Sequence, residues 1–165
     1  MTASTPARLQ LDGHCLIVLE RTLLAAAPDE GCALLMGERQ GSVLGLRAIW
    51  PCRNTWHPVE ERPQRFRLDP REQLLAQRWG RSRGLLVIGA AHSHPSSEAV
   101  PSTTDRQLCI GPTLMLIRSG LHRGLPALRA WWIPENAGDD EPSAPPSELP
   151  IELLPEAPRS ERLGE

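Results

Sequence analysis

The chain has 165 residues, of which 40% are hydrophobic and 23% charged, so it is large enough to bury one core without disulfides or a structural metal. Its net charge of −2 argues against a general nucleic-acid or membrane-surface partner. All 18 Lys or Arg positions are arginine, which excludes a lysine Schiff-base mechanism. Scattered cysteines, no signal peptide and no bilayer-length apolar run predict a reduced cytoplasmic protein.

The first fifty residues predict a strand, a helix and a hairpin. Residues 8–13 alternate apolar and polar side chains, as a half-buried strand does. Residues 14–27 carry good helix formers with an apolar stripe, and the following proline ends that helix. The apolar runs 32–37 and 42–50 flank the turn-like ERQGS, which predicts a β-hairpin.

The middle of the chain predicts a loop, a second helix and a buried strand. Residues 51–64 contain three prolines and no periodicity, which is typical of a loop, and the triplet FRL at 66–68 predicts a short strand. Asp69 is a candidate N-cap for a helix over 70–83 that begins with proline. The continuous apolar run within 84–94 is typical of a buried central strand.

The last third of the chain predicts a short helix, two strands and a tail. Residues 102–109 fit a short helix, and residues 112–119 and 127–134 fit two strands. Acidic, Pro- and Ser-rich residues 135–148 predict a flexible segment, and residues 149–155 a last edge strand before a disordered end. Strands mixed with two main helices predict an α/β or α+β layered domain.

The candidate functional residues lie in the segment AHSHPSSEAVPSTTD, residues 91–105. At the end of the predicted strand, His92 and His94 share one face and Ser93 points to the other. Two imidazoles on one face can converge on one metal ion, although histidines near a strand end are also common without a metal. These residues alone leave both interpretations open.

Asp105 favours the metal interpretation. It follows a loop that has to turn back, because Pro95 and Pro101 prevent a simple continuation of strand or helix. A set of His92, His94 and Asp105 leaves a fourth position for water, as a catalytic zinc site requires.

The same stretch also fits a helix start, with Ser102 as N-cap and Asp105 in the capping-box position. Ser102 therefore has two candidate roles. It caps the helix, or its hydroxyl stabilises the oxyanion of a tetrahedral intermediate.

A metal hydrolase also needs a general base, and two glutamates are candidates. Glu98 lies in the loop after the histidines, where we expect it to be solvated. Glu30 lies between the end of a helix and the apolar CALLMG, where a carboxylate at the edge of a core carries a desolvation cost. From its position alone, Glu30 is equally compatible with a surface residue at a helix-strand junction.

The spacing H-x-H-P-x(6)-S-x-x-D from His92 to Asp105 resembles the motif of the JAMM metalloproteases, also called MPN+ or Mov34/PAD-1. The family's upstream element is a Glu followed by an apolar strand that ends in Gly; PDEGCALLMG resembles it and selects Glu30. The similarity extends from about Cys15 to Trp132, includes NTW and FRLDPREQLL, and is greatest to short prokaryotic members that process sulfur-carrier or ubiquitin-like proteins. At Ala33 relatives often have Gly instead.

The resemblance implies roles for five residues. His92, His94 and Asp105 bind Zn²⁺, Glu30 is the base that acts on water at the open zinc position, and Ser102 supports the oxyanion. The implied activity is a metallopeptidase or isopeptidase that hydrolyses the amide bond after the C-terminal Gly-Gly of a ubiquitin-like or sulfur-carrier protein. Such a tail can enter a narrow groove and add a strand to a sheet edge. The chain lacks the large insertions of eukaryotic deubiquitinases, which argues against linkage-specific deubiquitination.

The resemblance also implies the fold, a mixed β-sheet flanked by helices in a cytidine-deaminase-like layered architecture. We expect a JAMM/MPN+ domain over residues 1–135. A flexible acidic, Pro-rich segment over 136–149 and an edge strand with a disordered tail over 150–165 follow it. The sequence leaves the oligomeric state open, with a homodimer as one option.

Three alternative functions differ from this one in the sequence features that they require. A non-catalytic MPN scaffold usually lacks one or more ligands, whereas this chain keeps all five motif residues. A small-molecule zinc amidase would use the same chemistry and stays open. A zinc deaminase needs H-x-E with a downstream P-C-x-x-C, and the sequence has neither.

Overall fold

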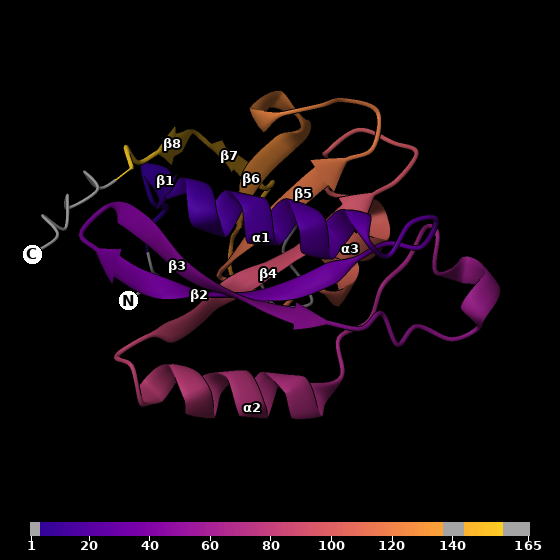
Figure 1. Ribbon diagram of the computed structural model, residues 1–165, viewed down its shortest axis with the longest axis horizontal. Helices are drawn as coiled ribbons and strands as arrows, with labels where there is room; N and C mark the ends of the chain where they lie inside the picture. Colours follow the sequence, from indigo (N-terminus) through magenta and orange to yellow (C-terminus); the bar gives the residue numbers. More distant parts are fainter. Residues whose placement is uncertain (1–3, 137–143, 157–165) are drawn as a thin grey trace, which may run out of the picture.

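The computed structural model describes residues 4–136 and 144–156, which form one mixed sheet with helices on both faces (Figure 1). The helices are α1 (Gly13–Leu24), α2 (Pro70–Arg81) and α3 (Thr103–Leu108), with short 3-10 helices at Val59–Glu61 and Leu125–Ala127. The strands are β1 (Arg8–Leu11), β2 (Cys32–Gln40), β3 (Val43–Cys52), β4 (Leu86–His94), β5 (Thr113–Ser119), β6 (Leu128–Ile133), β7 (Ser147–Leu149) and β8 (Ile151–Leu153). Their order in the sheet is β7-β6-β5-β4-β2-β3-β1-β8. The prediction of a mixed sheet flanked by helices is confirmed.

The two long helices begin at side-chain caps. The carboxylate of Asp12 accepts a hydrogen bond from Cys15 N at 2.8 Å, and Asp69 accepts one from Arg71 N at 2.9 Å. Pro70 occupies the first turn of α2, where its missing N–H costs nothing. The helix predicted over 14–27 ends at Leu24, because a series of turns then leads the chain back to β2.

The two faces of the sheet bury different cores. Between α1 and the sheet lies a leucine-rich cluster that includes Leu19, Leu35 and Leu116, all fully buried. On the opposite face, α2 packs through Ala76 against Leu34 and neighbouring side chains. Figure 1 shows α1 and α2 on opposite sides of β2 and β4. The sheet therefore separates the leucine-rich cluster under α1 from the cluster under α2.

The last two strands join the two edges of the sheet. The sequence predicts one edge strand over 149–155, but the structure has two strands separated by Pro150. Strand β7 pairs with β6 at one edge, and β8 pairs with β1 at the other. Pro150 cannot donate to a ladder, but its carbonyl accepts a hydrogen bond from Leu9 N at 3.0 Å. The two edge strands are thus separated by a single residue in the sequence, so the sheet has to curl to bring its two edges together.

The prediction of a strand at 66–68 is wrong, because these residues lie in a loop. The Asn54 side chain provides the reason, because its Oδ1 accepts hydrogen bonds from Trp56 N and Arg67 N and holds the segment as a loop. The predicted flexible segment falls partly at 137–143, outside the described residues, and its last residues belong to β7. The expected disordered end at 157–165 also lies outside them, and the domain limits stay predictions. Among the described residues, no helix has the length and apolar character needed to cross a membrane.

Candidate metal centre

Strand β4 presents both histidines to the face opposite α1. His92 and His94 are buried there, with relative exposures of 0% and 5%. Ser93 points the other way, as the strand periodicity predicts, and its Oγ accepts a hydrogen bond from Gly31 N at 2.8 Å. The central strand thus fixes the two imidazoles on one side and ties the start of β2 in place on the other.

Helix α3 brings Asp105 to the same point. Ser102 is the N-cap, and its Oγ accepts from Asp105 N at 3.0 Å, while Asp105 Oδ2 accepts from Ser102 N at 2.9 Å. This reciprocal capping box fixes the start of the helix and with it the direction of the carboxylate. The capping and metal interpretations of Asp105 therefore describe the same geometry.

Three donor atoms meet in a tight triangle. His92 Nε2 lies 3.1 Å from His94 Nε2, and Asp105 Oδ2 lies 3.0 Å from the first and 3.1 Å from the second. Ligands of a tetrahedral zinc ion with bonds of about 2.0–2.1 Å lie about 3.3 Å apart. The donor types and their spacing therefore fit a zinc ion, with one tetrahedral position left for water or substrate.

The surroundings orient His94 for this task. Its Nδ1 donates to the carbonyl of Glu98 at 2.7 Å, which leaves the Nε2 lone pair for a metal. His92 stacks on Phe66, with ring centroids 4.4 Å apart, and its Nδ1 has no hydrogen-bond partner among the described residues. Both rings are held so that Nε2 points to Asp105.

Electrostatics favour an ionised carboxylate here. Burial alone raises the pKa of Asp105, but hydrogen bonds from His92 and His94 outweigh it and hold that pKa well below its usual range. Burial lowers the pKa of His92. For His94, burial also disfavours the charged form, yet hydrogen bonds to Asp105 and Glu98 raise the pKa overall. The triangle is thus negatively charged at its carboxylate corner, as a cation site requires.

Glu30 is buried beside the triangle. Its relative exposure is 3%, and its Oε2 has no hydrogen-bond partner among the described residues. Burial raises its pKa to about 8, while the charge on His94 acts in the opposite direction. A carboxyl group whose pKa lies near neutrality can both take and release a proton at ordinary pH.

The backbone of Glu30 is held on both sides. Glu30 N donates to Arg62 O at 2.8 Å, and Asn54 Nδ2 donates to Glu30 O at 3.1 Å. Asn54 also donates to Arg65 O at 2.8 Å, so one side chain joins Glu30 to the loop that carries Phe66.

The other glutamate points away from the triangle. Glu98 is exposed, and its carboxylate pairs with His122 Nε2 at 2.8 Å on the surface. Only its backbone carbonyl reaches the site, through His94. The expectation that Glu98 is solvated agrees with this position.

Several residues of the site are missing from the sequence-based set. Ser93 binds the backbone of Gly31, Asn54 binds the backbone of Glu30, and Phe66 stacks on His92. Each of these contacts joins residues that are far apart in the sequence. Asn54 lies in NTW and Phe66 begins FRLDPREQLL, and both stretches contribute to the family resemblance, which is the signal that pointed to this loop.

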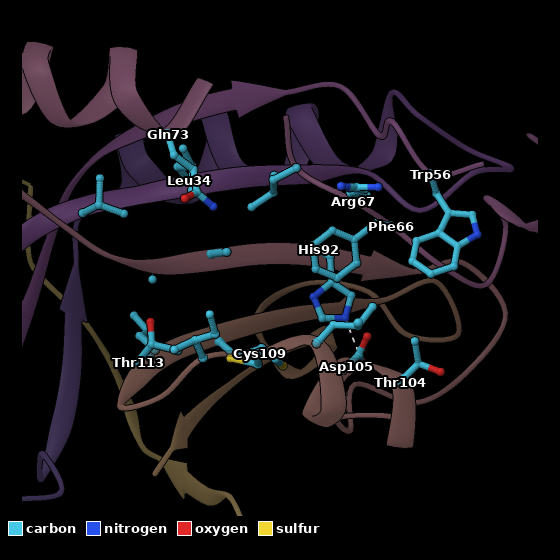
Figure 2. Close-up of a pocket in the computed structure, with 18 of the residues that line it drawn as sticks. Leu34, Trp56, Phe66, Arg67, Gln73, His92, Thr104, Asp105, Cys109 and Thr113 are labelled. Atoms are coloured by element: carbon cyan, nitrogen blue, oxygen red, sulfur yellow. Dashed lines mark hydrogen bonds and ion pairs between the residues drawn. The ribbon is translucent and has the colours of Figure 1, made fainter. Parts of the chain in front are cut away.

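A cavity of about 710 Å³ opens from the triangle across the outer face of β4. Figure 2 shows His92 and Asp105 between Phe66 and Trp56 on one side and Cys109 on the other. The rest of the cavity lining comes from β2, the loop before α2, the side of α2, β4 and the segment from α3 to β5: Leu34, Arg67, Leu68, Gln73, Gln77, Val87, Gly89, Ala90, Thr104, Leu108, Ile110, Thr113, Leu114 and Met115.

Residues 15–134 match the family model described as prokaryotic homologs of the JAB domain. The chain is 34% identical over 118 residues to the CysO-cysteine peptidases of Mycobacterium tuberculosis and Mycobacterium bovis, which covers 70% of this chain and 75% of theirs. It is 33% identical over 85 residues to the desampylase of Haloferax volcanii, covering 52% of this chain and 58% of that one. The solution structure of a Desulfitobacterium hafniense protein matches with a TM-score of 0.75 and 29% identity, over 92% of this chain and 97% of that chain.

Proposed function

The chain belongs to the family of prokaryotic homologs of the JAB domain, and from this membership we propose that it is a zinc-dependent metallopeptidase. Its proposed reaction is hydrolysis of the amide bond after the C-terminal Gly-Gly of a ubiquitin-like or sulfur-carrier protein. The observation that carries the proposal is the triangle of His92, His94 and Asp105, with donor atoms 3.0–3.1 Å apart next to the buried Glu30.

In this proposal His92 Nε2, His94 Nε2 and Asp105 Oδ2 hold the ion. When bound, zinc supplies Lewis-acid chemistry, polarising a carbonyl and lowering the pKa of water towards about 7. Glu30 takes a proton from the attacking water and later passes it to the leaving amine. Its partner-free Oε2 and its pKa of about 8 suit both steps.

Ser102 has the capacity for the oxyanion role. Its Oγ uses a lone pair to accept from Asp105 N, so its own O–H proton is still free to donate to the oxygen of a substrate carbonyl. Ser102 is exposed at the start of α3, where a substrate can reach it. In this proposal one hydroxyl both fixes Asp105 and donates to the substrate oxygen.

The names of the relatives support a peptidase. One relative is named a CysO-cysteine peptidase and another a desampylase. A small-molecule amidase is the second candidate, because a cavity of about 710 Å³ also falls within the range that holds drug-sized ligands. Cytoplasmic location and a homodimer stay predictions.

The test is mass spectrometry of a β-grasp carrier whose Gly-Gly terminus is joined to cysteine through an amide bond. Incubation with the zinc-loaded protein is expected to release cysteine and leave the carrier ending in Gly-Gly. A chelator should stop the reaction and added zinc should restore it. An intact conjugate, in the presence of stoichiometric zinc, would contradict the proposal and favour the amidase. A protein that binds no stoichiometric zinc would be a scaffold.

A further inference from the structure

Glu30 marks one end of the site along the sheet. Cys32 lies level with His92 in the antiparallel pairing of β2 and β4, and Ser93 N donates to Gly31 O at 3.0 Å. Since β2 and β4 run in opposite directions, Glu30 lies beyond this pair, towards the C-terminal end of β4. It is not among the residues that line the cavity.

The cavity runs from His92 in the opposite direction. Its floor passes Ala90, which is level with Leu34 of β2, and reaches Val87. At a rise of about 3.3 Å per residue, Ala90 lies about 7 Å and Val87 about 16 Å from His92 along the strand. Glu30 and the cavity therefore flank the metal triangle on opposite sides.

This arrangement orients the substrate. In the proposed function Glu30 hands a proton to the leaving amine, so the amine side of the scissile bond faces Glu30 and the acyl side faces the cavity. Resting on that function, we propose that the cavity holds the residues before the Gly-Gly and selects an apolar side chain three to five residues before the scissile bond. An extended tail rises by about 3.3 Å per residue, so its two glycines occupy the space nearest the ion and the next three residues lie over Leu34, Ala90 and Val87.

The size and chemistry of the cavity fit an apolar side chain. A volume of about 710 Å³ is far more than two glycines, which have no side chains, can fill. Of the described residues that line it, Arg67 and Asp105 are the ones with formal charges, and Figure 2 places both near His92. The far part is uncharged and is lined mostly by apolar side chains such as Leu34, Val87 and Leu114, with the polar Gln73, Gln77 and Thr113 among them. Apolar walls favour an apolar side chain of the substrate, because contact removes both apolar surfaces from water.

The rim of the cavity supports the same conclusion. Leu108 and Ile110 line it and are 60% and 88% exposed, while Gln73 and Gln77 of α2 form the facing rim. These two exposed apolar side chains lie beside a cavity that is continuous with the triangle of His92, His94 and Asp105. A substrate side chain bound in the cavity would cover them.

The experiment compares synthetic peptides that all contain one Gly-Gly amide. One peptide has serine at every other position, three have a single leucine at the third, fourth or fifth position before the bond, and one has leucine after the bond. With zinc-loaded protein, leucine at one of the three acyl positions is expected to raise kcat/KM about tenfold or more over the all-serine peptide, mainly through KM. Leucine after the bond is expected to have little effect.

Leu108→Ser tests the cavity itself. The leucine preference should fall about fivefold or more in this variant, because the apolar rim is lost at a position exposed enough to tolerate serine. Leu74→Ser is the matched control, since Leu74 is 67% exposed on α2 and does not line the cavity, and it should keep the preference.

The outcomes separate the inference from the function. Equal cleavage of all peptides, or a preference for leucine after the bond, would overturn the inference and leave the function standing. Cleavage of a carrier conjugate without cleavage of any peptide would also overturn it, because recognition would then rest on the folded carrier. If neither the peptides nor the carrier conjugate is cleaved, the proposed function fails and the inference with it.

Discussion

The two faces of β4 differ in what they bury. Towards α1 the strand contributes Ala91 to a leucine-rich core, and the buried charge on that side, Arg118 of β5, pairs with Glu20 of α1 at 3.6 Å. Towards the cavity the same strand buries His92 and His94 beside Asp105, with Glu30 nearby, whose Oε2 has no hydrogen-bond partner in the described part of the chain. The first face lowers the free energy of the fold by removing apolar surface from water, whereas the second face carries polar groups that are costly to bury without a ligand.

The α1 side of β4 therefore contributes mainly to stability, and the cavity side carries the groups that could perform chemistry. Variants on the α1 side should change the free energy of unfolding and leave the ligand set intact. Variants on the cavity side should change metal binding or turnover, with smaller effects on the fold. Zinc content, turnover and unfolding measurements therefore distinguish the two faces.

The largest effect is expected from Asp105→Ala. Two imidazoles then remain for zinc, so we expect the metal to be lost and turnover to fall to background. The substitution also removes half of the α3 capping box. Asp69→Ala is the matched control, because it removes the cap of α2, at a cost of about 1 kcal/mol, without removing a donor atom of the triangle. Elemental analysis should find zinc in the control and none in Asp105→Ala, and full zinc in both would contradict the site.

Glu30→Gln should have the next largest effect. Gln keeps the shape of Glu30 and its backbone contacts but cannot take a proton, so turnover of the Gly-Gly conjugate should fall by roughly 10² to 10⁴ with zinc still bound. Glu98→Gln is the control, since its carboxylate pairs with His122 on the surface and its backbone carbonyl would still accept from His94. Near-normal turnover of Glu30→Gln would remove the base assignment.

On the other face, Leu19→Ala should destabilise the protein without touching the chemistry. Leu19 is fully buried between α1 and the sheet, and a buried Leu→Ala change costs about 2–5 kcal/mol. Ile17→Ala on the same helix is the control, because Ile17 is 52% exposed. Urea unfolding should separate the two, and zinc content per folded chain should be unchanged in both. A small loss for Leu19→Ala would contradict the view of this face as the main core.

The convergence of His92, His94 and Asp105 is the part of the site that the sequence predicted best. Strand alternation put His92 and His94 on one face, and the spacing to Asp105 matched a family motif, so local geometry and resemblance pointed to the same atoms. The structure adds that the capping box on Ser102 is itself what directs the Asp105 carboxylate. A motif with fixed short spacing can be predicted because the residues between its members fix their geometry.

Long-range contacts were beyond prediction from the sequence. The side chain of Asn54 holds Glu30 from 24 residues away, and Ser93 holds Gly31 from 62 residues away. Their hydrogen bonds depend on how strands pair, which the residues themselves do not reveal. For the same reason the sequence did not predict two strands around Pro150. These strands pair with opposite edges of the sheet, and the periodicity of the sequence does not show that the sheet is curled.

The most gradual effect should appear in the stability of the metal-free protein as a function of pH. The pKa of Glu30 rises from 4.5 in the unfolded chain to about 8 in the fold, chiefly because of burial. Between these values the folded protein keeps a proton that the unfolded chain has released. Raising the pH through this window therefore lowers the free energy of unfolding, by up to about 1.4 kcal/mol per pH unit.

Glu30→Gln removes this contribution, because Gln does not titrate. Urea unfolding of the metal-free wild type and Glu30→Gln at pH 5, 6, 7 and 8 should show the variant gaining stability relative to the wild type as the pH rises. Asp105 stays ionised over this range in both proteins, because its pKa is held well below its usual range, so the difference between the curves reports Glu30 together with its charge coupling to His94. Parallel curves would mean that Glu30 is solvated like an ordinary glutamate, and the cavity side would then lack the unpaired buried carboxylate that separates it from the leucine face.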